Sequence, residues 1–232
     1  MREAGQIWLQ LSDLTTQTGL QPVLSTRGAE EFMDPCDIAE VDRLDGGAIV
    51  AQLWEEKAVD DGDEESAAWV DDWVEPFDRD FPGLAAPGDK PRTTAELTAA
   101  LDTLPPAYVY LAPAGRPADY LAPAGRPADV VAVAGWETTD AWDNWLPALA
   151  AVLRSWEVRF GARLLQLGPG AELRLLVSRP PRSGSQILLA AAELWAFGNR
   201  AWGGYEHRTE AESVMDIAYT VVRQPIWGFW WD

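Results

Sequence analysis

One stretch of the sequence, residues 140–161, constrains the fold more than any other. Its apolar residues recur every three or four positions, at Leu146, Leu149, Leu153, Trp156 and Phe160. This spacing places them on one face of an α-helix and leaves the polar residues off that face. Gly161 is expected to end the helix. We therefore expect a long amphipathic helix, with the rest of the second half of the chain packed on its apolar face.

Two strands and a second helix are predicted directly after this helix. The strands, Ala162–Leu167 and Glu172–Ser178, flank a Gly168-Pro169-Gly170 turn. Pro180-Pro181 then breaks the chain before a helix from about Gln186 to Phe197. A helix, two strands and a helix in succession predict a layer of helices on a sheet.

The remaining predicted elements are shorter. They are strands at Gln6–Leu11, Gln21–Ser25 and Tyr108–Ala112, and helices at Gly47–Lys57, Ala95–Leu104 and Glu210–Val221. Thr93 or Thr94 is expected to cap the helix that begins at Ala95. The whole pattern predicts an α+β protein with a mixed or antiparallel sheet and helices packed on it.

The charge of the chain restricts its partners. Lysine and arginine total 18 against 37 acidic residues, a net charge of −19. Such a surface repels phosphate backbones, so we expect no nucleic-acid partner. No apolar N-terminal run and no hydrophobic stretch of about 18 residues is present, so we expect a cytoplasmic protein with no membrane contact.

Few side chains are available for binding a transition metal. With one histidine, His207, and one cysteine, Cys36, the chain cannot build a two-histidine site. The acidic run Asp60–Glu65 superficially resembles a calcium loop, but the ligand spacing and terminal glutamate of an EF-hand are not in place. A solvated loop is the better interpretation of this run. We therefore expect neither a metal nor a cofactor.

The sequence contains one internal repeat. Tyr110–Asp119 recurs unchanged as Tyr120–Asp129. A single pair of ten-residue units is too short for a solenoid, so a tandem duplication is the better interpretation. We expect one copy to serve the fold and the other to form a surface loop. The alternative is that the two Arg/Asp copies form a bivalent binding site.

Four separate motifs of the second half occur in the order and spacing of a known family: Leu153–Ala162, the strand into Arg179-Pro-Pro181, Ala192-Glu193 with Phe197, and Trp227–Asp232. They resemble the bacterial family called domain of unknown function 4253. The resemblance is strongest from about Tyr108 to Asp232, and Phe81–Pro87 is similar to the front region of actinobacterial members. We therefore divide the chain into an N-terminal accessory region, residues 1–104, and a domain resembling this family, residues 105–232.

The sequence departs from the family pattern at two places. Members often carry Ala-Glu-His and then Phe-Cys-Pro-Asp-Asn, where this chain reads Ala192-Glu193-Leu194 and Phe197-Gly198-Asn199. Any role of that histidine or cysteine is therefore absent here. The resemblance implies a fold and no reaction, which favours binding over catalysis.

The polar residues nearest these motifs are Arg154, Glu157 and Arg159 on the first helix and Glu193 on the second. Arg154 and Glu157 lie three residues apart, so a surface ion pair is expected between them. The alternative is an Arg/Glu pair that lines a pocket and binds a carboxylate or phosphate. For Glu193 we favour an ion pair with an arginine of the neighbouring helix over a desolvated carboxyl suited to acid–base work.

The thirteen tryptophans are unusual for a chain of this length, and most are expected in the core. In a C-terminal strand, Trp227, Phe229 and Trp231 share one face, so Trp230 is expected to be the more exposed. An exposed aromatic side chain there suits a binding surface. The candidate binding residues are therefore Arg154, Trp156, Glu157, Arg159, Glu193, Trp202 and Trp230.

These observations predict a non-enzymatic cytoplasmic protein whose acidic, Trp-rich surface recognises a protein partner. An immunity-type inhibitor of a basic toxin is one concrete form, because negative charge speeds association with a basic target. The alternative is a hydrolase or transferase that uses Glu157 or Glu193 with Arg154 in a Trp-lined cleft. An enzyme needs these groups to converge in a pocket, whereas a binding protein does not. We assign no catalytic residue, and the sequence leaves the oligomeric state open.

Overall fold

A computed structural model of the protein describes residues 3–25, 36–58, 70–104, 108–113, 126–134, 136, 146–168, 172–198, 200–203, 211 and 213–231. The acidic run, His207, residues 140–145, the 169–171 turn and residues 114–125 of the repeat lie outside these ranges. The strands are β1 Leu20–Ser25, β2 Tyr108–Pro113, β3 Ala162–Gly168, β4 Glu172–Val177, β5 Arg200–Gly203 and β6 Ile226–Trp230.

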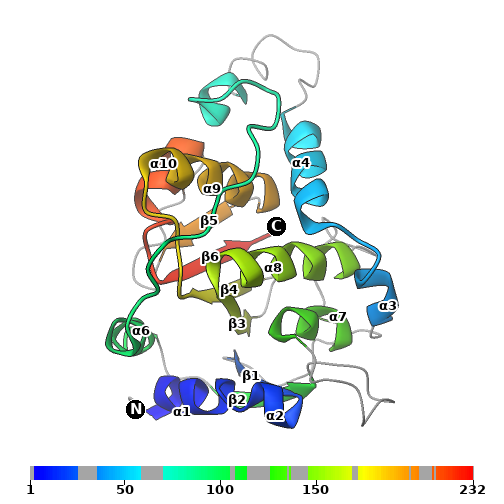
Figure 1. The fold of residues 1–232 in the computed structure, drawn as a ribbon, viewed down its shortest axis with the longest axis vertical. Helices are drawn as coiled ribbons and strands as arrows, with labels where there is room; N and C mark the ends of the chain where they lie inside the picture. The colour runs from blue at the N-terminus through cyan, green and yellow to red at the C-terminus, as the bar shows by residue number, and fades with distance from the viewer. Residues whose placement is uncertain are drawn as a thin grey trace.

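The helices precede, separate and cover these strands (Figure 1). They are α1 Glu3–Ser12, α2 Thr15–Thr18, α3 Ile38–Val41, α4 Gly46–Lys57, α6 Thr94–Leu101, α7 Val130–Val133, α8 Leu146–Phe160, α9 Gly184–Phe197 and α10 Val214–Thr220, with a 3-10 helix, η1, at Pro127–Asp129. Residues 70–74 form a further short helix. No helix in these ranges is long and apolar enough to cross a membrane.

The strands form one six-stranded mixed sheet in the order β2-β1-β3-β4-β6-β5. β1 and β3 run parallel, and the other neighbouring strands run antiparallel. The sheet and the helices packed on it confirm the predicted α+β class with a mixed sheet. The β1–β3 contact has the fewest bridge pairs in the sheet, a single one between Leu24 and Gln166.

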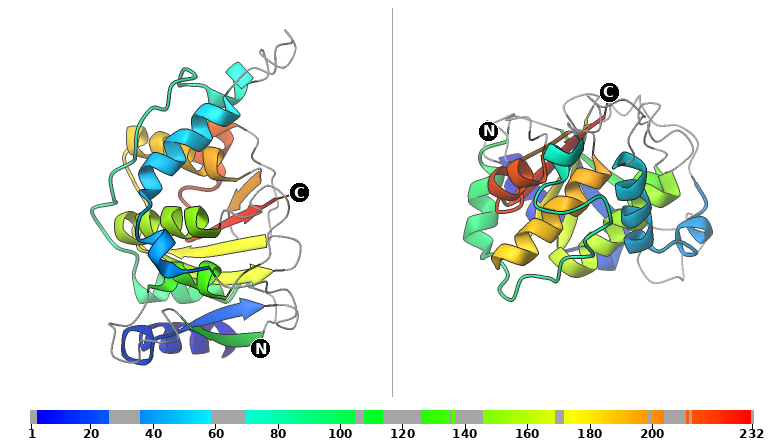
Figure 2. Two further views of the ribbon diagram at one scale, coloured as in Figure 1. Left: turned by 90° about the vertical axis from the view of Figure 1, so that its right-hand side faces the viewer. Right: turned by 90° about the horizontal axis from the view of Figure 1, so that it is seen from above.

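Helices cover both faces of the sheet (Figure 2). On one face, α4, α8 and α9 enclose the main core with inward side chains of β4 and β6, such as Leu175 and Phe229. On the other face, α1 and α6 enclose a smaller core, in which Trp8 and Leu101 pack against Leu176. Alternation along each strand separates the two cores.

The central helix α8 has the apolar face that its spacing predicts. Leu146, Leu149, Leu153, Trp156 and Phe160 are all buried. The helix ends at Gly161, whose φ is 58°. A Cβ at Gly161 would lie 2.2 Å from Ser178 Oγ, so a larger residue would meet both a strained backbone and a clash. The predicted end of the helix is therefore confirmed.

The N-terminal segment is a correction to the predicted structure. Gln6–Leu11 was expected as a strand because Ile7, Leu9 and Leu11 alternate, but it lies within helix α1. Within residues 5–12 of this helix, Gly5, Trp8 and Ser12 are buried, three and four apart, whereas Ile7 is 43% exposed. The helical period of the buried residues therefore decides the structure.

The other predicted elements form close to their expected places. Thr93 and Glu96 make a capping box at the start of α6. α10 begins at Val214, where Ser213 and Asp216 make a second capping box. β1 pairs with β3, and α4 shares the main core with α8 and α9. Both halves of the chain therefore contribute to the same sheet and to the main core. The division into residues 1–104 and 105–232 stays a prediction.

Candidate functional site

The candidate residues of α8 fall into two groups that face different neighbours. Trp156 and Arg159 contact Glu193 of α9. Arg154 and Glu157 contact η1 and α3 instead. The structure therefore forms two separate polar clusters along one helix.

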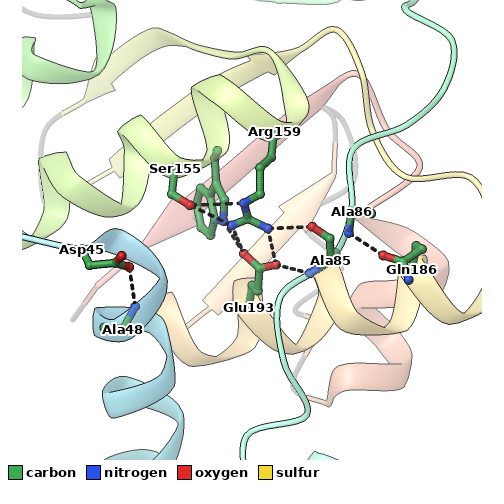
Figure 3. Close-up of polar contacts among 9 residues, drawn as sticks. Asp45, Ala48, Ala85, Ala86, Ser155, Arg159, Gln186 and Glu193 are labelled. Atoms are coloured by element: carbon green, nitrogen blue, oxygen red, sulfur yellow. Dashed lines mark hydrogen bonds and ion pairs between the residues drawn. The ribbon is translucent and has the colours of Figure 1, made fainter.

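The first cluster surrounds the carboxylate of Glu193, which is fully buried (Figure 3). Its Oε1 accepts hydrogen bonds from Arg159 Nη1 at 2.6 Å and from the main-chain N–H of Ala85 at 2.8 Å. Its Oε2 accepts from Arg159 Nη2 at 2.5 Å and from Trp156 Nε1 at 2.8 Å. The bidentate ion pair with Arg159 confirms the predicted partnership with an arginine of the neighbouring helix.

Arg159 is held in place from two further sides. Its Nε and Nη2 donate to Ser155 Oγ at 3.2 and 3.0 Å, one helical turn earlier. Its Nη1 also donates to the carbonyl oxygen of Ala85 at 2.9 Å. The N–H and C=O of Ala85 are therefore both bound by the Arg159–Glu193 pair, and we call these three residues the clamp.

The clamp holds an extended segment, residues 83–92, which we call the strap (Figure 3). Along the strap, the N–H of Ala86 donates to Gln186 Oε1 on α9. Further on, the N–H of Gly88 donates to the carbonyl of Arg179 at 3.3 Å, and the N–H of Arg92 to that of Ser178 at 2.7 Å. The strap is thus bound through its main chain from α9 to the end of β4.

The second cluster is centred on Arg154. Its Nε and Nη2 form a bidentate pair with Asp129, and its Nη1 donates to Asp42 Oδ1 at 2.8 Å. Burial lowers the pKa of Arg154, but the hydrogen bonds and charges of Asp129 and Asp42 outweigh it and raise the pKa. The predicted Arg154–Glu157 ion pair is not formed among these described residues, because two other carboxylates hold the guanidinium.

Asp129 binds Arg154 rather than a helix end. It stands at the N-cap position of α7, but its side chain makes no capping hydrogen bond there. Its carboxylate is almost fully buried and turns to Arg154 instead.

Glu157 is the candidate carboxylate with the fewest direct partners. It is partly buried and accepts one hydrogen bond, from the N–H of Ala128 at 3.3 Å. Burial and, to a smaller extent, the charge of Asp129 raise the pKa of Glu157, and together they exceed the lowering by the Ala128 N–H and by the charges of Arg126 and Arg163. A partly exposed carboxyl with a raised pKa is chemically suited to proton transfer.

The aromatic candidates occupy different environments. Trp156 is fully buried and stacks on Phe229 with ring centroids 5.5 Å apart. Trp227, Phe229 and Trp231 are buried, whereas Trp230 is only partly buried, as predicted. Trp202 lies in β5 opposite Gly228 of β6.

Sequence reasoning missed Lys57, at the end of α4. Its Nζ donates to the carbonyl oxygens of Trp195 and Gly198 at 2.6 and 2.8 Å and lies 4.4 Å from the Trp195 ring. Burial lowers the pKa of Lys57 to about 7. Its place in the last turn of a predicted helix was visible, but the end of α9, which it caps, lies 138 residues away in sequence. No group of three or more possible metal ligands occurs within the described ranges.

The fold and the clamp define an α+β protein whose C-terminal half carries a buried arginine–glutamate pair that binds the main chain of its own N-terminal half. Residues 120–232 match the model of a protein family described as Domain of unknown function (DUF4253). The match contains α8 and α9, hence Arg159 and Glu193, whereas the strap lies outside it. No curated protein and no solved structure was found to match the chain.

Proposed function

We propose that this protein is a non-enzymatic binding protein that recognises a basic protein partner through an acidic surface. The supporting observation is a concentration of exposed carboxylates on α3, on α4 and on residues 70–80, which we call the acidic arm. These carboxylates belong to Asp37, Glu40, Asp42, Asp45, Glu55, Glu56, Asp71, Asp72, Glu75, Asp78 and Asp80.

Basic side chains balance little of this charge. In residues 36–58 and 70–80, Arg43 is the one exposed basic residue. Lys57 binds main-chain carbonyls, Arg79 pairs with Asp71 at 3.0 Å, and Arg154 of α8 pairs with Asp42 at 2.8 Å. The acidic arm therefore carries a large uncompensated negative charge.

The acidic arm lies along one side and one end of the molecule, where α3 and α4 are labelled in Figure 1. A surface of one sign steers a partner of the opposite sign and raises the association rate. The same charge repels nucleic acids and anionic membrane surfaces. A basic protein is therefore the partner that fits this surface.

The polar clusters support binding rather than catalysis. The four donors to Glu193 and the two carboxylates on Arg154 are structural contacts that a substrate would have to displace. The alternative, a hydrolase or transferase, is favoured by the raised pKa of Glu157 alone. In that case Glu157 would act beside Arg154, with Glu193 remaining in the clamp.

The proposal extends to a bacterial, cytoplasmic setting, which the sequence resemblance favours. A protein that masks a basic toxin inside its own cell is one concrete form, since fast capture is what a strongly charged surface provides. Trp230, partly buried on the last strand, is a further candidate for the partner surface.

Two matched double variants test the proposal. Glu55→Gln with Asp72→Asn removes two charges from the acidic arm, and Asp89→Asn with Asp102→Asn removes two exposed charges elsewhere. The partner is captured from the native host, identified by mass spectrometry, purified, and its binding to each variant is measured at several salt concentrations.

We expect the first variant to lower the association rate by about tenfold and to weaken the salt dependence, and the second to change both much less. Equal effects of the two variants, or a partner with an acidic surface, would contradict the proposal.

A further inference from the structure

The outer edge of strand β2 is unpaired within the described part of the chain. β2 is the last strand at one end of the sheet, and no strand in the described ranges pairs with its outer side. None of its six residues carries a charge, although the chain has 37 acidic residues. Tyr108 and Leu111 of this strand are 67% and 52% exposed. Natural sheets commonly protect an edge with charges, and this edge has none of its own.

Pro22 decides which main-chain groups of β2 face outward. It lies opposite Leu111 and has no N–H to donate. Its carbonyl oxygen is occupied by Trp8 Nε1 at 2.7 Å and Gln21 Nε2 at 3.0 Å. Pro22 and Leu111 therefore form a non-hydrogen-bonded pair, and such pairs alternate with hydrogen-bonded ones. It follows that the N–H and C=O groups of Val109 and Leu111 point away from β1, toward the open edge.

We propose that this edge pairs with the β2 edge of a second copy of the chain, antiparallel and about a twofold axis. Two identical edges related by a twofold axis are self-complementary, because each offers the same donors and acceptors in opposite order. Val109 and Leu111 of each copy supply the main-chain hydrogen bonds. The two sheets then continue into one another.

The charge distribution favours a second copy as the occupant of this edge. Two chains of net charge −19 repel each other wherever their acidic surfaces approach. β2 lies at the opposite end of the long axis from the C-terminal end of α4 and residues 70–74 (Figure 1). Pairing through β2 therefore keeps these parts of the two acidic arms far apart. A basic partner would find no carboxylate on this strand to pair with.

Exposed apolar side chains add to the main-chain pairing. Tyr108 packs its ring 6.3 Å from that of Tyr110 on one face of the strand, and Leu111 is exposed on the other. Pairing with a second strand brings cross-strand neighbours over both faces and removes apolar surface from water.

The oligomeric state of the full chain tests this inference, measured by sedimentation equilibrium over a wide range of concentration. The wild-type chain is expected to form a concentration-dependent dimer. Leu111→Lys places two like charges at the twofold contact and is expected to give a monomer with an unchanged circular dichroism spectrum. Tyr219→Lys is the matched control, because Tyr219 is 68% exposed on α10, and it is expected to remain dimeric.

A pair of proline variants tests the assigned direction of the main-chain groups. Leu111→Pro removes an outward N–H and is expected to abolish the dimer while the monomer stays folded. Ala112→Pro removes an inward N–H that binds β1 and is expected to lower the unfolding temperature of the monomer as well. A wild-type monomer at all concentrations, or a dimer that survives in Leu111→Lys, would overturn the inference. Dissociation by Tyr219→Lys would place the contact elsewhere.

Discussion

Two of the contacts between the N-terminal and the C-terminal half of the chain are built on opposite principles. At one of them, the clamp, a buried ion pair binds the main chain of Ala85. Beside it, Trp54 of α4 packs its ring 4.9 Å from that of Trp195 on α9. Charge and aromatic packing therefore hold α4 and the strap to the main core.

At the other place, the β1–β3 contact, a neutral side chain joins the two halves. Gln21 is fully buried, and its Nε2 donates to the carbonyl oxygen of Leu164 on β3 at 3.1 Å. Its Oε1 accepts a hydrogen bond from Thr15 Oγ1 at 3.1 Å. The side-chain amide of Gln21 thus adds a hydrogen bond between β1 and β3, which share one bridge pair.

The two contacts differ in the kind of buried group that is left without a partner when they break, and therefore in the free-energy cost of breaking them. Breaking the clamp leaves a buried charge without its partner, which costs about 3 to 5 kcal/mol. Breaking the Gln21 contact leaves a neutral carbonyl, which costs about 1 to 3 kcal/mol. We therefore expect β1 and β2 to open locally at a lower free energy than α4 and the strap.

Removing the clamp carboxylate should have the largest effect. Glu193→Ala leaves the guanidinium of Arg159 partly buried without its carboxylate, and should lower the free energy of unfolding by about 3 to 5 kcal/mol in urea. Glu193→Gln keeps the shape and one acceptor and should cost less. A cost for Glu193→Ala below about 1 kcal/mol would show that the clamp is not a buried charge pair in solution.

Trp230 and Trp231, at and just after the end of β6, provide a reference for the two contacts. Trp231 is buried against Phe197 and Phe229, so Trp231→Ala should cost about 3 to 5 kcal/mol. Trp230 is partly buried, and Trp230→Ala should cost far less. If both variants unfold at equally low temperature, Trp230 is as much a part of the core as Trp231.

Gln21→Ala tests the weaker contact. It should lower the free energy of unfolding by about 1 to 3 kcal/mol, because the carbonyl of Leu164 loses a donor. Hydrogen exchange should accelerate more at the amides of Val23 and Leu24 than in α8, where it follows only the change in global stability. Gln17→Ala, at an exposed position of α2, is the control and should leave both measurements unchanged. Equal acceleration in α8 would mean that the two contacts open together.

Lys57 makes the contact of α4 with α9 dependent on pH. Its pKa is lowered to about 7 in the folded protein, against about 10.4 for an unfolded lysine. Between these values the unfolded state binds more protons, so this group makes stability rise with pH from about 7 to about 10.4. Below pH 7 the cost of burying the charge remains in full, offset by the two carbonyls it binds.

The pH effect is measured as the difference in urea midpoint between wild type and Lys57→Met across this pH range. The difference should change with pH for Lys57→Met and stay constant for Lys90→Met, whose side chain is exposed. A constant difference for both variants would show that Lys57 keeps an ordinary pKa in the folded state.

The smallest effect is expected from shortening the link between β2 and η1. Because the two copies of the repeat are identical, deleting residues 120–129 gives the same polypeptide as deleting residues 114–123. The product keeps both Tyr110–Pro113, which is part of β2, and Arg126–Asp129, which holds η1 and the partner of Arg154. The unfolding temperature should move by a few degrees at most. Loss of cooperative unfolding would contradict this expectation.

Local patterns predicted those parts of the fold that depend on neighbouring residues. The capping pair Thr93 and Glu96 and the apolar spacing of α8 are both visible over a few positions. The prediction of a strand at Gln6–Leu11 was wrong, because Ile7, Leu9 and Leu11 alternate by chance. The buried face of helix α1 contains the small residues Gly5 and Ser12, whose side chains give no apolar pattern in the sequence.

The candidate site could be predicted only in part, for a physical reason. The sequence predicted an ion pair between Glu193 and an arginine of the neighbouring helix, and Arg159 is that arginine. A further partner of Glu193 is the main chain of Ala85, which lies 108 residues away and has a side chain without functional groups. The pairing of Arg154 with Asp129 depends on how η1 packs against α8, which no short-range spacing encodes.

The bridge between Leu24 and Gln166 has a consequence for the order in which the chain assembles. The two residues are 142 positions apart, so during synthesis β1 leaves the ribosome long before its partner β3 exists. At roughly 5 to 20 residues per second the interval is about 7 to 28 s. Val23 and Leu24, which end up fully covered, stay without their final neighbours for that time. We therefore expect the nascent N-terminal segment to need protection from aggregation during this interval.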